Sequence, residues 1–159
     1  MQPRRSPGLD ANAMPAIEVC SDANVAYQWF VAEGEPKAEV EAARTLVRLF
    51  AEGEISLSVL DLTRYELGNA LLRGRIKASA EETSATLDAL AGTCPAVSPT
   101  ATDIRHAARL ADQHHLTLYD ATYVAVAHSR GAQLATLDRA LLEAGLGRRP
   151  SEIVAMAQG

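Results

Sequence analysis

Short runs of alternating apolar residues and longer amphipathic segments follow one another along the chain. Residues 17–21 and 55–59 place apolar side chains at every second position, which is typical of strands. Residues 37–52 carry an apolar stripe at helical spacing, and Gly53 follows where a helix C-cap is expected. The same patterns predict helices at 23–32, 62–75, 79–90, 100–114, 120–130 and 138–144, and further strands at 94–98, 133–137 and 153–156.

This alternation of strands and helices predicts an α/β fold with a mostly parallel central sheet and helices on both faces. No internal repeat or linker divides the chain, so residues 16–159 are expected to form a single domain. Residues 1–15 are expected to be a disordered extension, and Met14 is an alternative start. Sites in such folds form beyond the carboxyl ends of the strands. Asp22 and Asp138 each directly follow a predicted strand.

The composition of the chain excludes few classes of function. The net charge of −5 and the pI of about 5.3 argue against binding of nucleic acid through an overall basic surface. A nuclease is still compatible with them, because a bound cation would offset a carboxylate pocket. Cys20 and Cys94 have no metal-binding spacing and are expected to be buried thiols. No membrane span or signal peptide is recognised, so we expect a cytoplasmic protein.

Acidic residues in apolar or small surroundings are the candidate chemistry of the chain. Asp22, Asp120 and Asp138 each precede a predicted helix, and each taken alone is better explained as an N-cap. Glu66 has no such explanation, because it falls within a helix beside its apolar stripe. A charge there is costly unless it is paired or binds metal, and Arg73 is the candidate for a salt bridge.

The order and context of these acids resemble the PIN-domain ribonucleases, most closely the VapC-type toxins. The resemblance covers residues 17–156, nearly the whole predicted domain. The Trp29-Phe30 pair follows the first motif, and Asn24 stands where Ser is also common. The motifs are Asp22-Ala23-Asn24 after a strand, Tyr65-Glu66-Leu67-Gly68-Asn69-Ala70-Leu71, Leu116-Thr117-Leu118-Tyr119-Asp120-Ala121-Thr122-Tyr123, and Leu134-Ala135-Thr136-Leu137-Asp138.

The resemblance implies a three-layer α/β/α sandwich with a central, mostly parallel five-stranded sheet, whose first and fourth strands lie side by side. It implies an RNA-cleaving site that leaves a 5′-phosphate and a 3′-hydroxyl. Asp22, Asp120 and Asp138 would be metal ligands, with Glu66 a ligand directly or through water. Clustered carboxylates require a cation, and oxygen ligands select Mg²⁺ or Mn²⁺.

The resemblance also implies partners. Toxins of this type are dimers, and each is silenced by an antitoxin whose segment crosses the acidic pocket. An Arg or Lys of the antitoxin would there replace the charge of the metal.

Several neighbouring residues have two interpretations. Asn24 and Thr136 either orient the metal ligands or serve ordinary turns and caps. Arg64, Arg73 and Arg139, with Arg75 and Lys77, either contact RNA or form a solvated charged face. Tyr119 and Tyr123 either stack on bases or pack in the core. Asp103 is better explained by a capping box with Thr100.

Three alternatives are kept open. A histidine-based nuclease would use His106, His114, His115 or His128 as acid and base, and would need no metal. A non-catalytic protein-binding module would use its acids only as caps. A PIN-domain nuclease of RNA processing, rather than a toxin, would lack a neighbouring antitoxin gene.

Overall fold

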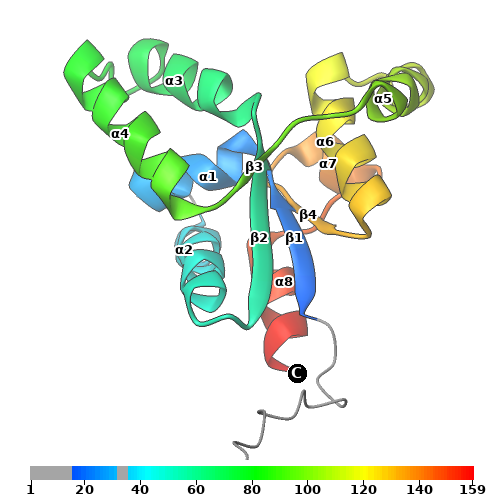
Figure 1. Cartoon of the computed structure of the whole chain (residues 1–159), viewed down its shortest axis with the longest axis horizontal. Helices are drawn as coiled ribbons and strands as arrows, with labels where there is room; N and C mark the ends of the chain where they lie inside the picture. The colour runs from blue at the N-terminus through cyan, green and yellow to red at the C-terminus, as the bar shows by residue number, and fades with distance from the viewer. Residues whose placement is uncertain (1–15, 32–35) are drawn as a thin grey trace, which may run out of the picture.

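Four parallel strands form the central sheet in the order β3-β2-β1-β4 (Figure 1). Strand β1 pairs with β2 in a register that sets Ile17 opposite Ile55, and its other edge pairs with β4. The carboxyl ends of β1 and β4 therefore meet, as expected. The strands are β1 (Ile17–Ser21), β2 (Ile55–Leu60), β3 (Ala96–Val97) and β4 (Gln133–Ala135).

The computed structural model describes residues 16–31 and 36–159. The extension expected at residues 1–15 lies outside the described residues, as does most of the break expected at 33–36. The helices are α1 (Ala23–Phe30), α2 (Lys37–Ala51), α3 (Thr63–Arg73), α4 (Ala80–Thr93), α5 (Ala101–His114), α6 (Leu118–Arg130), α7 (Arg139–Glu143) and α8 (Pro150–Gln158).

Each face of the sheet is covered by its own group of helices, which makes the fold a three-layer α/β/α sandwich (Figure 1). Successive strand residues point to opposite faces, so Val19 and Cys20 enter different cores. Val19 packs in the core formed with α1, α2, α3, α4 and α8. Cys20 packs in the core formed with α5, α6 and α7.

The prediction of a strand at residues 153–156 is wrong, because this segment belongs to helix α8. Pro150 occupies the first helical position, where its missing N–H costs nothing. The Glu152 carboxylate accepts a 2.8 Å hydrogen bond from the Arg149 N–H and closes the first turn. Among residues 16–31 and 36–159, the sheet continues beyond β4 only as a single parallel bridge from Ala135 to Arg148. The described sheet thus has four strands instead of the expected five.

Three predicted helix ends have the contacts expected there, whereas α1 and α3 end two residues earlier than predicted and α4 ends three residues later. Gly53 adopts a φ of +76° just after α2, a conformation that residues with a Cβ rarely adopt. Ser79 accepts from the Glu82 N–H at the start of α4, and Thr100 forms the expected capping box with Asp103. These contacts explain Asp103 as a structural residue.

Both cysteines are free thiols in the core, as expected. Burial raises the pKa of Cys20 to about 12 and that of Cys94 to about 11, so neither is a ready nucleophile. Across residues 16–31 and 36–159, no helix has the length and apolar character that a membrane crossing requires.

Helix α8 is held against α2 by a buried carboxylate. Glu39 is only 7% exposed, and its side chain accepts from the Ser151 N–H at 3.1 Å and from the Ser151 hydroxyl at 2.6 Å. It thereby satisfies a free N–H at the helix start and places a negative charge at the positive end of the helix dipole.

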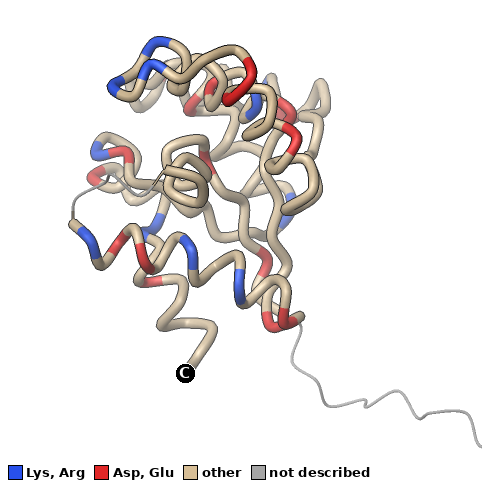
Figure 2. Tube along the Cα trace, turned by 90° about the vertical axis from the view of Figure 1, so that its left-hand side faces the viewer, with Lys and Arg blue, Asp and Glu red and all other residues tan. Residues whose placement is uncertain are grey.

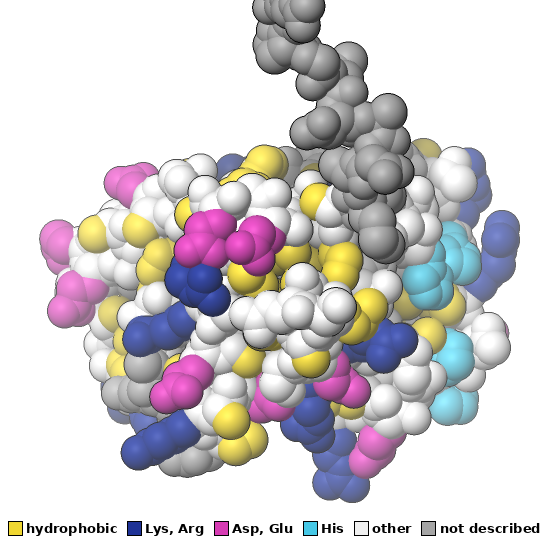
Figure 3. All heavy atoms as spheres, turned by 90° about the horizontal axis from the view of Figure 1, so that it is seen from below, with side chains coloured by type: hydrophobic (Ala, Val, Ile, Leu, Met, Phe, Trp, Pro, Cys, Tyr) yellow, Lys and Arg dark blue, Asp and Glu magenta, His cyan; other side chains and the backbone are white. Residues whose placement is uncertain are grey.

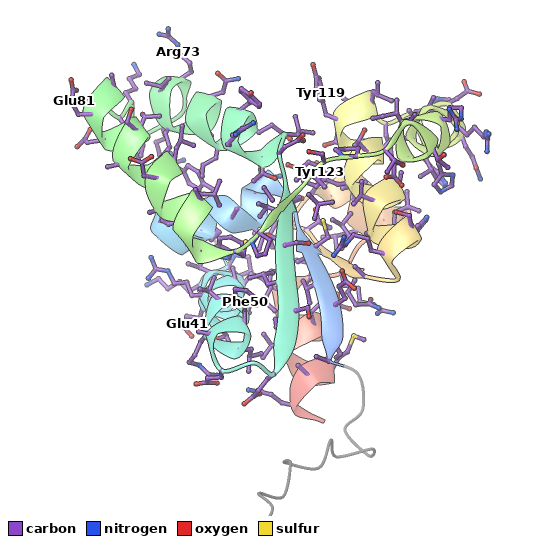
Figure 4. The ribbon with its side chains drawn as sticks, viewed as in Figure 1. Glu41, Phe50, Arg73, Glu81, Tyr119 and Tyr123 are labelled. Atoms are coloured by element: carbon purple, nitrogen blue, oxygen red, sulfur yellow. The ribbon has the colours of Figure 1, made fainter. Side chains whose placement is uncertain are left out.

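We predict that Glu39→Ala lowers the free energy of unfolding by about 1–2 kcal/mol, because α8 loses this cap. Urea unfolding of the purified protein measures the change. Glu41→Ala is the matched control, since Glu41 is exposed on the same helix and should change stability by less than about 0.5 kcal/mol (Figure 4). Equal effects of the two substitutions would contradict the capping role.

Candidate functional site

The four acids singled out from the sequence lie on four separate elements. Asp22 is the N-cap of α1 directly after β1, and Asp138 is the N-cap of α7 after β4. Glu66 lies in the first turn of α3, and Asp120 lies in the first turn of α6. Since β1 and β4 are parallel neighbours, Asp22 and Asp138 both lie at the carboxyl end of the sheet.

Asp22 is a buried carboxylate, only 4% exposed. Its Oδ1 accepts from the Val25 N–H at 3.0 Å, and its Oδ2 accepts from the Thr136 hydroxyl at 2.5 Å. Burial raises the pKa of Asp22 to about 7, although these two hydrogen bonds act in the opposite direction. The nearby charges of Glu66 and Asp138 raise this pKa further. Asp22 therefore titrates near neutral pH.

Thr136 links two of the acids through one hydroxyl. Its Oγ1 donates to Asp22 and accepts from the Asp138 N–H at 3.0 Å. The Asp138 carboxylate in turn accepts from the Leu141 N–H at 3.1 Å. Strand β4 ends at Ala135, two residues earlier than predicted, so that Thr136 and Leu137 form the turn that leads to Asp138.

Glu66 is half-buried, and its Oε1 is enclosed without a hydrogen-bond partner among the described residues. Burial raises the pKa of Glu66, a hydrogen bond from Tyr123 opposes the rise, and the charge of Asp120 adds to it. Arg73 lies at the outer end of α3 and forms no ion pair with Glu66 within the described part of the chain (Figure 4). The salt bridge considered for Glu66 is therefore absent.

Tyr123 supports Glu66 and cannot stack on a base. It is 1% exposed, and its hydroxyl lies 2.8 Å from the Thr63 hydroxyl, which accepts from the Leu60 N–H. Figure 4 shows Tyr123 directed toward the strand ends and Tyr119 directed outward. Of the two tyrosines considered for stacking, only Tyr119, with 64% exposure, is accessible.

Asp120 is oriented by a residue that the sequence analysis did not single out. Helix α6 begins at Leu118, two residues before the predicted start, so Thr117 and not Asp120 is its N-cap. The Thr117 hydroxyl accepts from the Asp120 N–H at 3.1 Å and donates to the Asp120 carboxylate at 2.7 Å. The spacing is that of Thr100 and Asp103, and this similarity could have revealed it.

The acids influence one another without forming a preassembled metal cluster. The charges of Glu66 and Asp138 act on Asp22, and that of Asp120 acts on Glu66. In the part of the chain that the structure describes, no three Asp, Glu, His or Cys side chains are grouped closely enough to hold an ion as they stand. The donors nevertheless fit a hard divalent cation, because all are carboxylates and the enclosed Glu66 oxygen lacks a partner.

The predicted cationic residues are all exposed. The Arg64 guanidinium lies 5.1 Å from the centre of the Tyr65 ring, and Arg139 pairs with Glu143. Along the trace, basic and acidic residues are intermingled (Figure 2), and the face seen from below has the same mixture (Figure 3). Neither view shows a large surface that is purely basic.

The lack of a side chain at Gly147 leaves room for the Thr136 methyl group beside β4. The segment beside β4 is fixed by hydrogen bonds from the Arg148 N–H to the Leu134 carbonyl at 2.8 Å and from the Thr136 N–H to the Arg148 carbonyl at 3.0 Å. A Cβ at residue 147 would overlap the Thr136 Cγ2. Thr136 is fully buried, and rotating its methyl group away would carry the hydroxyl off Asp22.

We predict that Gly147→Ala lowers the free energy of unfolding by about 1–3 kcal/mol, the usual cost of overpacking. Thr136→Ser keeps the hydroxyl but removes the clashing methyl. Gly147→Ala should therefore lower the free energy of unfolding much less in the Thr136→Ser variant than in the wild type. Urea unfolding of the four proteins measures the coupling. Strictly additive effects would contradict a contact between Gly147 and Thr136.

We also predict a pH dependence of stability that comes from Asp22. Its folded-state pKa of about 7 lies above the ordinary value of 3.8, so the folded state holds the proton more tightly. In EDTA, the free energy of unfolding should fall as the pH rises from about 4 to about 7. Asp22→Asn should reduce this fall by about 3 kcal/mol, measured by urea unfolding across this range. Identical pH profiles of the two proteins would contradict the raised pKa.

Solved structures with this fold come from several organisms. The structure of PAE2754 from Pyrobaculum aerophilum is 26% identical in sequence, with a TM-score of 0.65, over 90% of this chain and 98% of that one. The toxin VapC20 of Mycobacterium tuberculosis, described as cleaving the sarcin-ricin loop, is 19% identical, with a TM-score of 0.61, over 80% and 95%.

A toxin–antitoxin complex from Klebsiella pneumoniae is 17% identical, with a TM-score of 0.58, over 83% of this chain and 97% of that one. A search of curated protein sequences found no match. A family model described as the PIN domain matches residues 19–146. This match spans most of the chain and contains all four acids, so the chain belongs to the PIN domain family.

Proposed function

We propose that this protein is a metal-dependent ribonuclease that hydrolyses RNA phosphodiester bonds. One observation carries the proposal: four acids from separate elements influence one another at the strand ends, and they include a buried Asp22 with a raised pKa and an unpaired Glu66 oxygen. Membership of a family of nucleases supports it. A role as caps alone leaves the unpaired Glu66 oxygen unexplained.

Asp22, Asp120 and Asp138 are the proposed ligands of Mg²⁺ or Mn²⁺, with Glu66 a ligand directly or through water. When bound, the cation would acidify a water molecule and offset the charge that develops on the phosphate. A hard ion suits these ligands better than Zn²⁺, since the set contains neither thiolate nor imidazole.

The residues of the chain would position the reaction. Thr136 and Thr117 orient Asp22 and Asp120 through their hydroxyls. Tyr123 holds one side of Glu66, which leaves Oε1 free to accept a hydrogen bond from the attacking water or to contact the ion. In-line attack on phosphorus would leave a 5′-phosphate and a 3′-hydroxyl. Arg64, Arg73 and Arg139 are candidate contacts to the RNA backbone, and Asn24 is a candidate to orient the ligands.

The biological role that we propose is that of the toxin in a VapBC-type pair, acting as a homodimer on cytoplasmic RNA. The fold shared with VapC20 and with the Klebsiella complex supports this role. The partner would be an antitoxin with an Arg or Lys set against the acids. A small neighbouring gene whose product binds this chain and suppresses RNA cleavage would test the role, and its absence would favour an RNA-processing nuclease.

We predict that the purified protein, free of any antitoxin, cleaves a mixed RNA sample with Mg²⁺ or Mn²⁺ and not with EDTA. Asp22→Asn and Asp120→Asn should each reduce the rate by about a hundredfold or more, because each removes a charged ligand. Asp112→Asn is the matched control, since Asp112 is exposed on α5, outside this cluster.

Circular dichroism of each variant would confirm its fold. Metal-independent cleavage that survives both substitutions would sink the proposal and revive the histidine-based alternative. Lack of cleavage by the folded wild type in either metal would favour the binding module.

A further inference from the structure

A pocket of about 300 Å³ opens beside Glu66, and its walls come from three separate parts of the chain. Helix α1 and α3 form two of them, and Leu137, next to Asp138, forms the third. The lining residues include Asn24, Tyr27, Gln28, Glu66, Ala70 and Leu137. The volume lies at the lower end of the range for pockets that enclose small ligands.

The pocket combines an apolar part with unused hydrogen-bonding capacity. Ala70 and Leu137 supply apolar surface. The Oε1 atoms of Gln28 and Glu66 are both buried without a partner among the described residues. Gln28 also lies four residues after Asn24 on α1, so both amides are on one side of this helix. Leaving such an acceptor unpaired is costly, so a turn of the flexible Gln28 side chain that brings its oxygen to a donor in the pocket would be favoured.

We propose that this pocket binds one nucleobase of the RNA, and that Gln28 selects a base with an exocyclic amino group. The inference rests on the ribonuclease function proposed above. Ala23 and Leu137 line the pocket and directly adjoin Asp22 and Asp138 in the chain, so the pocket lies beside the acids that would hold the phosphate. The planar, partly apolar base suits the apolar walls, and its amino group donates to the Gln28 oxygen.

A base fits these observations better than an apolar side chain of a protein partner does. An aliphatic or aromatic side chain would bury the Gln28 oxygen and leave it unpaired. Adenine and cytosine carry an amino group at the position where uracil carries its O4 carbonyl oxygen. Uracil in the same orientation would therefore set that oxygen against the Gln28 oxygen, with its N3–H one position away. A site built to accept a hydrogen bond at a fixed position discriminates strongly against a ligand without a donor there.

The test maps the cleavage sites of a random-sequence RNA and then compares two oligonucleotides that differ only by cytosine or uracil at the preferred position. The wild type with Mg²⁺ or Mn²⁺ should prefer an amino-bearing base at one fixed position beside the cut, by about tenfold in kcat/KM. Gln28→Leu should reduce this preference below about twofold. Gln28→Glu should keep it, because its two oxygens can only accept.

Gln113→Leu is the control for the substitution itself, since Gln113 is exposed on α5. An unchanged preference in Gln28→Leu, or loss of the preference in Gln28→Glu, would overturn the assignment of Gln28. If Gln28→Leu left the cleavage pattern intact but weakened inhibition by the antitoxin, the pocket would belong to the protein partner instead. Cleavage by the wild type without any base preference removes only the pocket proposal, whereas absence of all cleavage removes the ribonuclease as well.

Discussion

The enclosure of the Asp22 carboxylate is the constraint on which the rest of the site depends. It lies at the end of a buried strand and keeps its position through the Val25 N–H and the Thr136 hydroxyl. The second of these contacts is available only because β1 and β4 pair directly in parallel. Pairing of two strands that are more than a hundred residues apart in the chain thus decides which hydroxyl faces the carboxylate.

Capping and chemistry are not competing explanations for these acids. Asp22 and Asp138 do cap helices, as the cautious interpretation of each held. Capping places each carboxylate at the positive end of a helix, which partly offsets the repulsion between them. The cap also fixes one oxygen of each carboxylate, so the direction of the other is set by the backbone. A local structural role can therefore pre-orient a group for a second purpose.

The features that could be predicted from sequence are those encoded by local pattern. The strand before Asp22, the caps at Ser79 and Thr100 and the apolar stripe of α2 all follow from neighbours within a few residues. The acids themselves were recognised from their motifs.

What the sequence could not reveal depends on tertiary contacts or on competing local signals. Residues 153–156 have an apolar run that suits a strand, yet Pro150 and Glu152 start a helix there. Tyr123 reads equally as a stacking or a core residue until its partner Thr63, sixty positions away, is known. Gly147 offered no signal, because its requirement comes only from the Thr136 methyl.

In the proposed function, binding of the cation would have to draw the carboxylates closer together, because the described side chains are not grouped closely enough to hold an ion as they stand. The carboxylates stand on separate elements, and those of Asp22, Asp120 and Asp138 are already bonded to the protein. Asp22 has a pKa of about 7, so binding at neutral pH would also release part of a proton. Metal affinity would then rise with pH over the range in which Asp22 ionises. The same hydrogen bonds that stabilise the clustered carboxylates in the fold would thus affect the strength of metal binding.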